Sequence, residues 1–154
     1  MKVKILSDEI MALIQEMLHK GRVVELTISG VSMRPFYLHQ ATVVTLVAPQ
    51  GKLKKYDVVL YRNHNKYKLH RIIGVKKGLL VICGDGLKEK EYIAPDAVFG
   101  KVIKHQTAGK IVNERSRWYL VKVFLWDLVY PIRRYLLRIF RKRVKDESDN
   151  QTIM

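Results

Sequence analysis

The sequence is poor in the residues that build disulfides, metal sites and cofactor loops. Its 154 residues include a single cysteine, Cys83, which rules out an internal disulfide framework. Neither a Cys-x-x-Cys nor a His-Glu-x-x-His spacing occurs, and no glycine-rich phosphate loop is present. The sequence therefore predicts no metal ion and no cofactor.

Long apolar runs are also missing. The best candidate for a membrane span is interrupted by Lys122, Asp127 and Arg133, whereas a spanning helix needs roughly 20 apolar residues. The N-terminal residues lead into a polar, acidic stretch without the apolar core of a signal peptide. We therefore expect a protein that does not cross the membrane and is kept on its cytoplasmic side.

Acidic residues are scarce beside basic ones. The chain has 14 Asp and Glu against 29 Lys and Arg, a formal net charge of +15. Between residues 101 and 145 the only acidic residues are Glu114 and Asp127. Such a charge favours an anionic partner, which could be a nucleic acid, an acidic lipid surface or an acidic peptide. Charge alone does not choose among the three.

The remaining composition predicts one mainly β domain. With 48% hydrophobic residues, the chain can bury a single core. Apolar residues at helical spacing predict a helix over 7–20, which Ser7 can cap. Alternating β-branched runs predict six strands, at 23–29, 42–48, 56–62, 66–75, 79–83 and 98–105. Turn-forming residues at 49–51, 63–65, 76–78 and 84–86 then predict hairpins and an antiparallel β-rich core.

The composition changes again after Gly109. We assign residues 1–108 to a single domain, 109–145 to a basic amphipathic helical C-terminal region, and 146–154 to a disordered tail. Pro131 is expected to break the helical pattern of 118–143 into two shorter helices.

Aromatic and cationic side chains are combined in this C-terminal region. They are Trp118, Tyr119, Phe124, Trp126 and Tyr130, and Arg133, Arg134, Arg138, Arg141, Lys142 and Arg143. This combination is typical of a helix lying in an anionic membrane interface. A helical hairpin that packs on the β core with solvated arginines explains the same pattern, and both descriptions can hold in part.

Two short segments carry the best clue to function. Ser32 lies in Gly30-Val31-Ser32-Met33-Arg34-Pro35, where the glycine allows a tight turn and the proline stiffens its exit. His70 follows in Leu69-His70-Arg71, and a neutral imidazole can take a proton from a serine hydroxyl. Lys68, on the same strand face, is a rival base only if burial strongly lowers its pKa.

The order of these motifs resembles signal peptidase I over residues 22–105. The matching segments are Gly30 to Pro35, Asp57 to Tyr61, His70 to Gly74, Gly84-Asp85 and Phe99 to Val102. They are most similar to the branch, with endoplasmic-reticulum and archaeal members, in which a histidine replaces the lysine base. Within the same superfamily, the SOS-type repressor peptidases also begin with a Gly-x-Ser-Met turn.

The resemblance implies a serine endopeptidase with a Ser-His dyad that acts on an extended peptide or precursor protein. Ser32 would be the nucleophile and His70 the base, while Gly30, Ser32 and Met33 would form and position the oxyanion hole. Arg71 would hold an acidic structural partner. Asp85 is the candidate acid for orienting His70 or for pairing with Arg71.

The chain departs from the family pattern at three places. The Gly-Asp expected after the nucleophile loop is Gln40-Ala41, the glycine expected before Asp57 is Tyr56, and the acidic cluster after Asp85 is shortened.

Two other functions fit parts of the sequence. A non-catalytic basic module could bind membranes or nucleic acid on the same fold, although basic and aromatic residues do not interleave within the β region. A self-cleaving, repressor-type regulator would share the serine turn. Such regulators use lysine as base and carry a DNA-binding domain, for which the residues before the first strand are too few.

Overall fold

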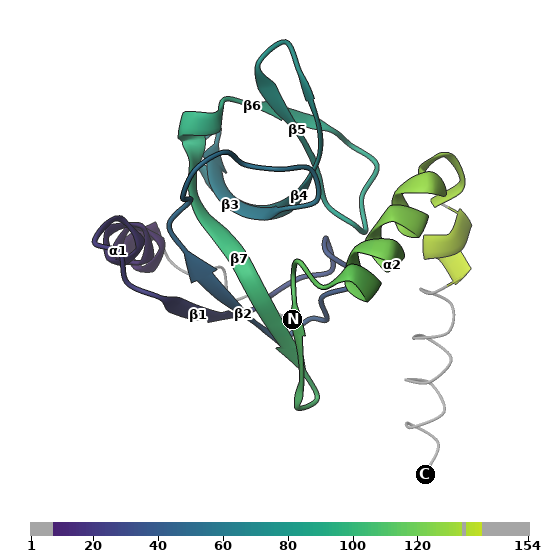
Figure 1. The fold of residues 1–154 in the computed structure, drawn as a ribbon, viewed down its shortest axis with the longest axis horizontal. Helices are drawn as coiled ribbons and strands as arrows, with labels where there is room; N and C mark the ends of the chain where they lie inside the picture. The colour runs from purple at the N-terminus through teal and green to yellow at the C-terminus, as the bar shows by residue number, and fades with distance from the viewer. Residues whose placement is uncertain (1–7, 134, 140–154) are drawn as a thin grey trace.

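The protein is built on one antiparallel β-sheet with a helix on either side (Figure 1). The computed structural model describes residues 8–133 and 135–139. The strands in this range are β1 (Val24–Thr27), β2 (Thr42–Val47), β3 (Val58–Asn63), β4 (Lys66–Lys76), β5 (Leu79–Cys83), β6 (Glu91–Ile93), β7 (Val98–Thr107) and β8 (Lys110–Asn113). Their order is β1-β2-β7-β3-β4-β5-β6, with β8 paired to β7, and every pair is antiparallel. The expected mainly β fold is confirmed.

Two of the predicted turns are β-hairpins. His64 and Asn65 join β3 to β4 with φ angles of 48° and 60°, and Lys77 and Gly78 join β4 to β5 with 51° and 77°. Two consecutive left-handed residues match a type I′ turn, whose twist suits neighbouring strands. The segment 49–51 is not a hairpin, because β7 lies between β2 and β3 in the sheet.

The outer strands β6 and β8 were not predicted. β6 has three residues and β8 has four, so neither shows enough alternation to stand out in the sequence. β8 pairs with the end of β7 across a turn at Ala108 and Gly109. The sheet therefore extends to residue 113, beyond the domain boundary expected at 108.

Alternation along β3 supplies two separate apolar cores. Val58 and Leu60 pack into a cluster with α1 (Asp8–His19), whereas Val59 and Tyr61 belong to a second cluster with β5 and β6. Gly100 on β7 lets α1 approach closely, because a Cβ there would lie 3.1 Å from the side chain of Leu18. The predicted N-terminal helix is confirmed and packs on the domain's own core.

The C-terminal region packs on the sheet through one side of α2 (Arg117–Leu128). A 3-10 turn, η2 (Tyr130–Ile132), follows, and the backbone at 133 and 135–139 is helical again, which confirms a break at Pro131. A second 3-10 turn, η1 (Pro95–Ala97), precedes β7. In the described part of the chain no helix combines the length and apolarity that a membrane span needs.

α2 is not amphipathic in the expected sense, since it is apolar on two opposite sides. Its inner stripe includes Tyr119 and Val123, which are buried, and its outer stripe is Trp118, Val121, Leu125 and Leu128, all exposed. Arg133, expected among the membrane-facing or solvated cations, is instead buried against the rings of Trp126 and Tyr130. Arg134 and the predicted cations at 141–143, like the tail at 146–154, lie outside the described residues.

Candidate active site

The turn that follows β1 holds Ser32. Gly30 has a φ of +97°, a conformation that glycine adopts without strain, and its amide donates to His39 Nδ1 at 2.7 Å. Met33 and Tyr37 are buried beneath the turn. The backbone on both sides of Ser32 is therefore anchored while Ser32 itself is only half-buried.

The segment that follows β5 lies directly against this turn. The Gly86 amide donates to the Ser32 carbonyl at 2.8 Å. A Cβ at Gly84 would lie 2.5 Å from the same carbonyl oxygen, and one at Gly86 would lie 2.7 Å from the carbonyl of Val31. Glycine is thus required at 84 and 86 by the close approach of two backbones, rather than by a special φ. The expected turn at 84–86 is a docking segment for Ser32.

The segment that contacts the Ser32 turn begins where β5 ends beside β4, the strand that carries His70. Arg71 on β4 is paired with Cys83, the last residue of β5, and Gly84 follows directly. The pairing of β4 with β5 therefore ends next to His70, at the start of the segment on which the Ser32 backbone rests.

The Ser32 hydroxyl and the His70 imidazole do not hydrogen-bond to each other. Both residues are described, and neither Ser32 Oγ nor His70 Nε2 makes any protein hydrogen bond or is fully enclosed. Ser32 is half-buried and His70 is buried. The predicted dyad is not preformed as a contact, a state that is common in active sites without substrate.

His70 is held at its other nitrogen. Its Nδ1 lies 3.0 Å from the Tyr61 hydroxyl on β3, and that hydroxyl donates to Glu91 Oε2 on β6 at 2.6 Å. Lys68 donates to Glu91 Oε1, so its amine is bound in an ion pair. Burial lowers the pKa of His70 to about 4, and the imidazole is neutral at pH 7, as a general base must be.

Asp85 pairs with Arg71 and makes no hydrogen bond to His70. The Arg71 guanidinium donates to both carboxylate oxygens, with Nε–Oδ1 and Nη2–Oδ2 distances of 2.9 Å. Burial raises the pKa of Asp85, while the guanidinium opposes that shift. The sequence left His70 and Arg71 open as partners for Asp85, and in the structure the partner is Arg71. His70 and Arg71 are neighbours on β4, so their side chains point to opposite faces of the sheet.

A buried polar network extends from this pair to the serine turn. Arg71 Nη2 also donates to the Tyr119 hydroxyl of α2 at 2.8 Å, and Nη1 lies 3.8 Å from Glu114 Oε2. Glu114 Oε1 is 2.6 Å from both the Tyr37 hydroxyl and His105 Nδ1. The network joins α2, β4, β7 and the turn that carries Ser32.

Two backbone amides at the turn are available for an oxyanion. Within 8–133 and 135–139, the N–H groups of Ser32 and Met33 donate to no protein acceptor. The amide of Gly30 is already bound to His39. The predicted oxyanion residues therefore divide into two donors and one glycine that sets the backbone conformation.

Two departures from the family pattern keep the backbone shape of glycine. Gln40 and Tyr56 stand where the family has glycine, and their φ angles are 55° and 75°. This left-handed region disfavours side chains by roughly 1–2 kcal/mol. Tyr56 gains a compensating hydrogen bond, from its hydroxyl to Asp127 Oδ2 at 3.0 Å.

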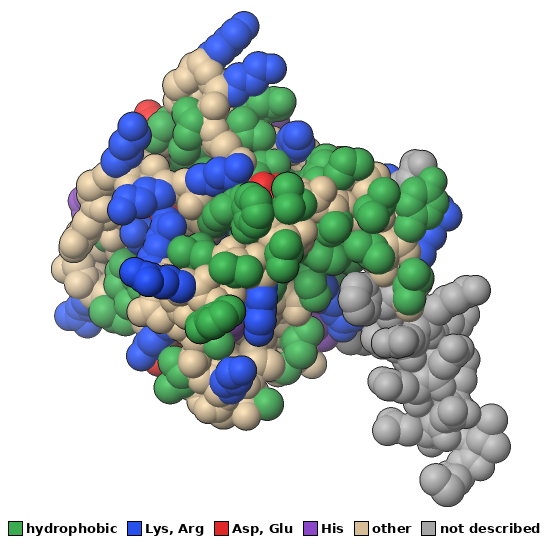
Figure 2. All heavy atoms as spheres, turned by 45° about the vertical axis from the view of Figure 1, so that its right-hand side comes forward, with side chains coloured by type: hydrophobic (Ala, Val, Ile, Leu, Met, Phe, Trp, Pro, Cys, Tyr) green, Lys and Arg blue, Asp and Glu red, His purple; other side chains and the backbone are tan. Residues whose placement is uncertain are grey.

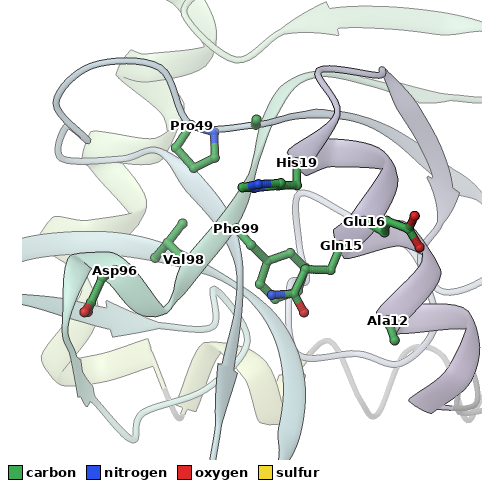
Figure 3. A pocket seen from close by; sticks show the side chains of 9 residues that line it. Ala12, Gln15, Glu16, His19, Pro49, Asp96, Val98 and Phe99 are labelled. Atoms are coloured by element: carbon green, nitrogen blue, oxygen red, sulfur yellow. The ribbon is translucent and has the colours of Figure 1, made fainter.

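An open pocket of about 560 Å³ lies elsewhere, between α1 and the start of β7 (Figure 3). Its lining includes Glu16, His19, Asp96 and Phe99, and none of the predicted site residues. Among the described residues no three His, Cys, Asp or Glu side chains are grouped to hold a metal ion.

Sequence reasoning missed Tyr61, Glu91 and Glu114 as parts of the site. Tyr61 and His70 lie on adjacent strands, so pairing β3 with β4 across the His64-Asn65 turn would have shown that they share a face. Glu91 and Glu114 gave no such signal, because β6 was not predicted and Glu114 lies just beyond β8, outside any strand.

No protein-family model and no curated protein matches this sequence. The resemblance to signal peptidase I therefore rests on the motifs themselves.

Proposed function

We propose that the protein is a serine endopeptidase that cleaves an extended peptide or precursor, with Ser32 as nucleophile and His70 as base. One arrangement carries the proposal. Gly84 and Gly86, which follow the strand paired with the His70 strand, hold the backbone of a half-buried Ser32 by close contact, and His70 on β4 supplies an imidazole that is neutral at pH 7. The left-handed backbone at Gln40 and Tyr56 further supports the signal-peptidase-like assignment.

The chemistry follows from these groups. Ser32 Oγ attacks the carbonyl carbon of the peptide while its proton moves to His70 Nε2. The amides of Ser32 and Met33 stabilise the oxyanion. As the C–N bond breaks, Nε2 returns the proton to the leaving amine, and water then hydrolyses the acyl-serine with His70 again as base. β1, an edge strand that runs into the Ser32 turn, can pair with the extended substrate.

Covalent labelling of the serine tests this proposal. The wild type should react at Ser32 with a fluorophosphonate probe, mapped by peptide mass spectrometry, and should cleave a mixed peptide library. Ser32→Ala should abolish both reactions, and His70→Ala should slow them by roughly 10²-fold or more. Ser29→Ala is the matched control, because Ser29 is an exposed serine of the same turn. Unchanged cleavage by Ser32→Ala would reject the proposal.

The outer side of α2 is the proposed attachment site for an anionic membrane at the cytoplasmic face. Figure 2 shows hydrophobic side chains gathered over this side, among them the outer stripe of α2, with Lys and Arg side chains on the surface around it. Trp118 is 81% exposed. Lys55 and Lys90 lie beside α2, in contact with Asp127 and Tyr130 respectively. Exposed apolar side chains with basic side chains beside them suit a lipid surface with acidic head groups.

Vesicle binding tests the attachment. Vesicles of phosphatidylglycerol and phosphatidylcholine should bind the protein in sedimentation assays, pure phosphatidylcholine should bind it less, and Trp118→Ala should weaken binding. Leu13→Ala is the control, because Leu13 is an exposed apolar residue on α1, which lies on the other side of the sheet from α2 (Figure 1). Equal binding by Trp118→Ala and wild type would reject α2 as the attachment site.

A non-catalytic basic binding module is the second candidate. The observation that favours it is the absence of a hydrogen bond between Ser32 and His70. This candidate predicts a protein that binds vesicles or nucleic acid in a steeply salt-dependent way, yet reacts with no serine probe.

A further inference from the structure

We infer that Tyr61 and Glu91 are positioning residues that hold His70 in the tautomer with a bare Nε2. The inference rests on the proposed peptidase function for its catalytic meaning, and on hydrogen-bond geometry for the tautomer itself. Neither residue touches the reacting atoms.

Three strands bring the groups together on one face of the sheet. Tyr61 on β3 is paired with Lys68 on β4, and His70 lies two residues along β4, so the three side chains point the same way. Glu91 comes from β6, paired with Ile82 of β5. The nearest titratable group on β5 is Cys83, whose thiol donates to the carbonyl of Gly84.

Counting protons along the chain of contacts fixes the direction of each hydrogen bond. Partial burial alone would raise the pKa of Glu91, but hydrogen bonds from Lys68 and Tyr61 lower it. Glu91 is therefore a carboxylate and can only accept hydrogen bonds. A tyrosine hydroxyl has a single proton. Tyr61 directs it to Glu91 Oε2, so the oxygen of Tyr61 can only accept from His70.

The His70 nitrogen next to Tyr61 must therefore carry the proton. In a neutral imidazole one nitrogen is a donor and the other an acceptor. With Nδ1–H bound to Tyr61 at 3.0 Å, Nε2 has the lone pair, and no donor in the described part of the chain occupies it. A serine proton can only be taken by that lone pair.

Lys68 completes the assembly by holding the second oxygen of Glu91. Its ammonium donates to Oε1 while Tyr61 occupies Oε2, so the carboxylate cannot turn away from the tyrosine. The pair also balances the charge of Glu91 beside a neutral imidazole. An acid acting through a tyrosine thus takes the orienting role that the sequence suggested for Asp85.

Nitrogen-15 NMR of labelled histidine reads the tautomer without any need for activity. The His70 signals are identified as those missing in His70→Gln. Wild type at pH 7 should show a protonated Nδ1 and a bare Nε2. Tyr61→Phe, which keeps the ring but removes the acceptor, should move the equilibrium toward protonated Nε2, and Glu91→Gln should do so in part. Tyr92→Phe and Glu89→Gln, on the same segment but outside the contacts of His70, should leave it unchanged.

The same variants connect the tautomer to reactivity. Tyr61→Phe should slow serine labelling by about 10²-fold with the folded state intact by circular dichroism, and Tyr92→Phe should not. A wild-type His70 protonated at Nε2, or a tautomer that Tyr61→Phe does not change, overturns the inference. A wild type that labels no serine rejects the proposed function instead, and leaves the tautomer result to stand by itself.

Discussion

At the scale of single residues, Gly84 and Gly86 occupy positions where a methyl group would collide with backbone rather than with movable side chains. A side chain can rotate away from an added atom, whereas two hydrogen-bonded backbone segments must separate. The glycines thus determine how closely the segment after β5 can approach Ser32.

Gly84→Ala should therefore destabilise the fold by about 1–3 kcal/mol, as overpacking of a tight site does, and should slow serine labelling as the Ser32 turn is displaced. Urea unfolding and the probe reaction measure the two effects. Gly74→Ala is the matched control, because Gly74 has an ordinary φ and open space around it. Equal stability of the two variants would show that the contact at 84 relaxes freely.

His70 should make stability depend on pH in a defined window. Burial lowers its pKa from 6.5 to about 4 in the folded protein. At neutral pH both states are unprotonated and His70 contributes nothing. Below pH 6.5 the unfolded chain binds a proton at His70, whereas the folded protein does not. The free energy of unfolding therefore falls until about pH 4, by up to ~3 kcal/mol.

Urea titrations between pH 7 and pH 4 check this expectation. His70→Gln should lose less stability than wild type across the window, since it removes the titrating group while the other acids and bases stay the same. His19→Gln, at the exposed end of α1, should follow the wild-type curve. A His70→Gln curve parallel to wild type would contradict the lowered pKa of His70 in the folded protein.

At the scale of elements, the two sides of α2 have different roles. Its inner side supplies Tyr119 to Arg71 and Trp126 to the Asp85 carbonyl, at 2.8 Å in both cases. Its outer side contributes exposed apolar surface. A helix with apolar residues on both sides has no single polar face, which is why an amphipathic pattern read from the sequence described it poorly.

Substitutions on the two sides of α2 should differ in their effect on stability. Tyr119→Phe removes a partner of a buried guanidinium and should lower the free energy of unfolding by about 1–3 kcal/mol. Trp118→Ala should change it by less than about 0.5 kcal/mol, because its side chain is in solvent. Chemical unfolding of both variants decides. A larger loss in Trp118→Ala would mean that the outer side is packed.

At the scale of the whole molecule, a net charge of +15 makes the chain repel itself. Adding salt screens this repulsion, while a buried pair such as Arg71 and Asp85 is screened much less. The free energy of unfolding in urea should therefore rise between low and moderate sodium chloride. A fall would show that surface ion pairs contribute more than the net repulsion.

The fold was largely predictable because long strands carry their own pattern, as the six predicted strands show. The site was predictable where neighbouring residues in the sequence determine the chemistry and the shape of the turn, as at Gly30 and Ser32. Its supporting groups were not, because Glu91 meets Tyr61 and Glu114 meets Tyr37 only after segments far apart in the sequence come together. Long-range register is a property of the folded chain that spacing along the sequence does not encode.

The hydrogen bond from the Gly86 amide to the Ser32 carbonyl offers a way to watch the site assemble. Exchange of that single amide proton for deuterium requires the two segments to part, so its protection factor measures how often the serine turn opens. Since α2 binds the neighbouring carbonyl of Asp85, a surface that immobilises α2 should slow this exchange even with no substrate present.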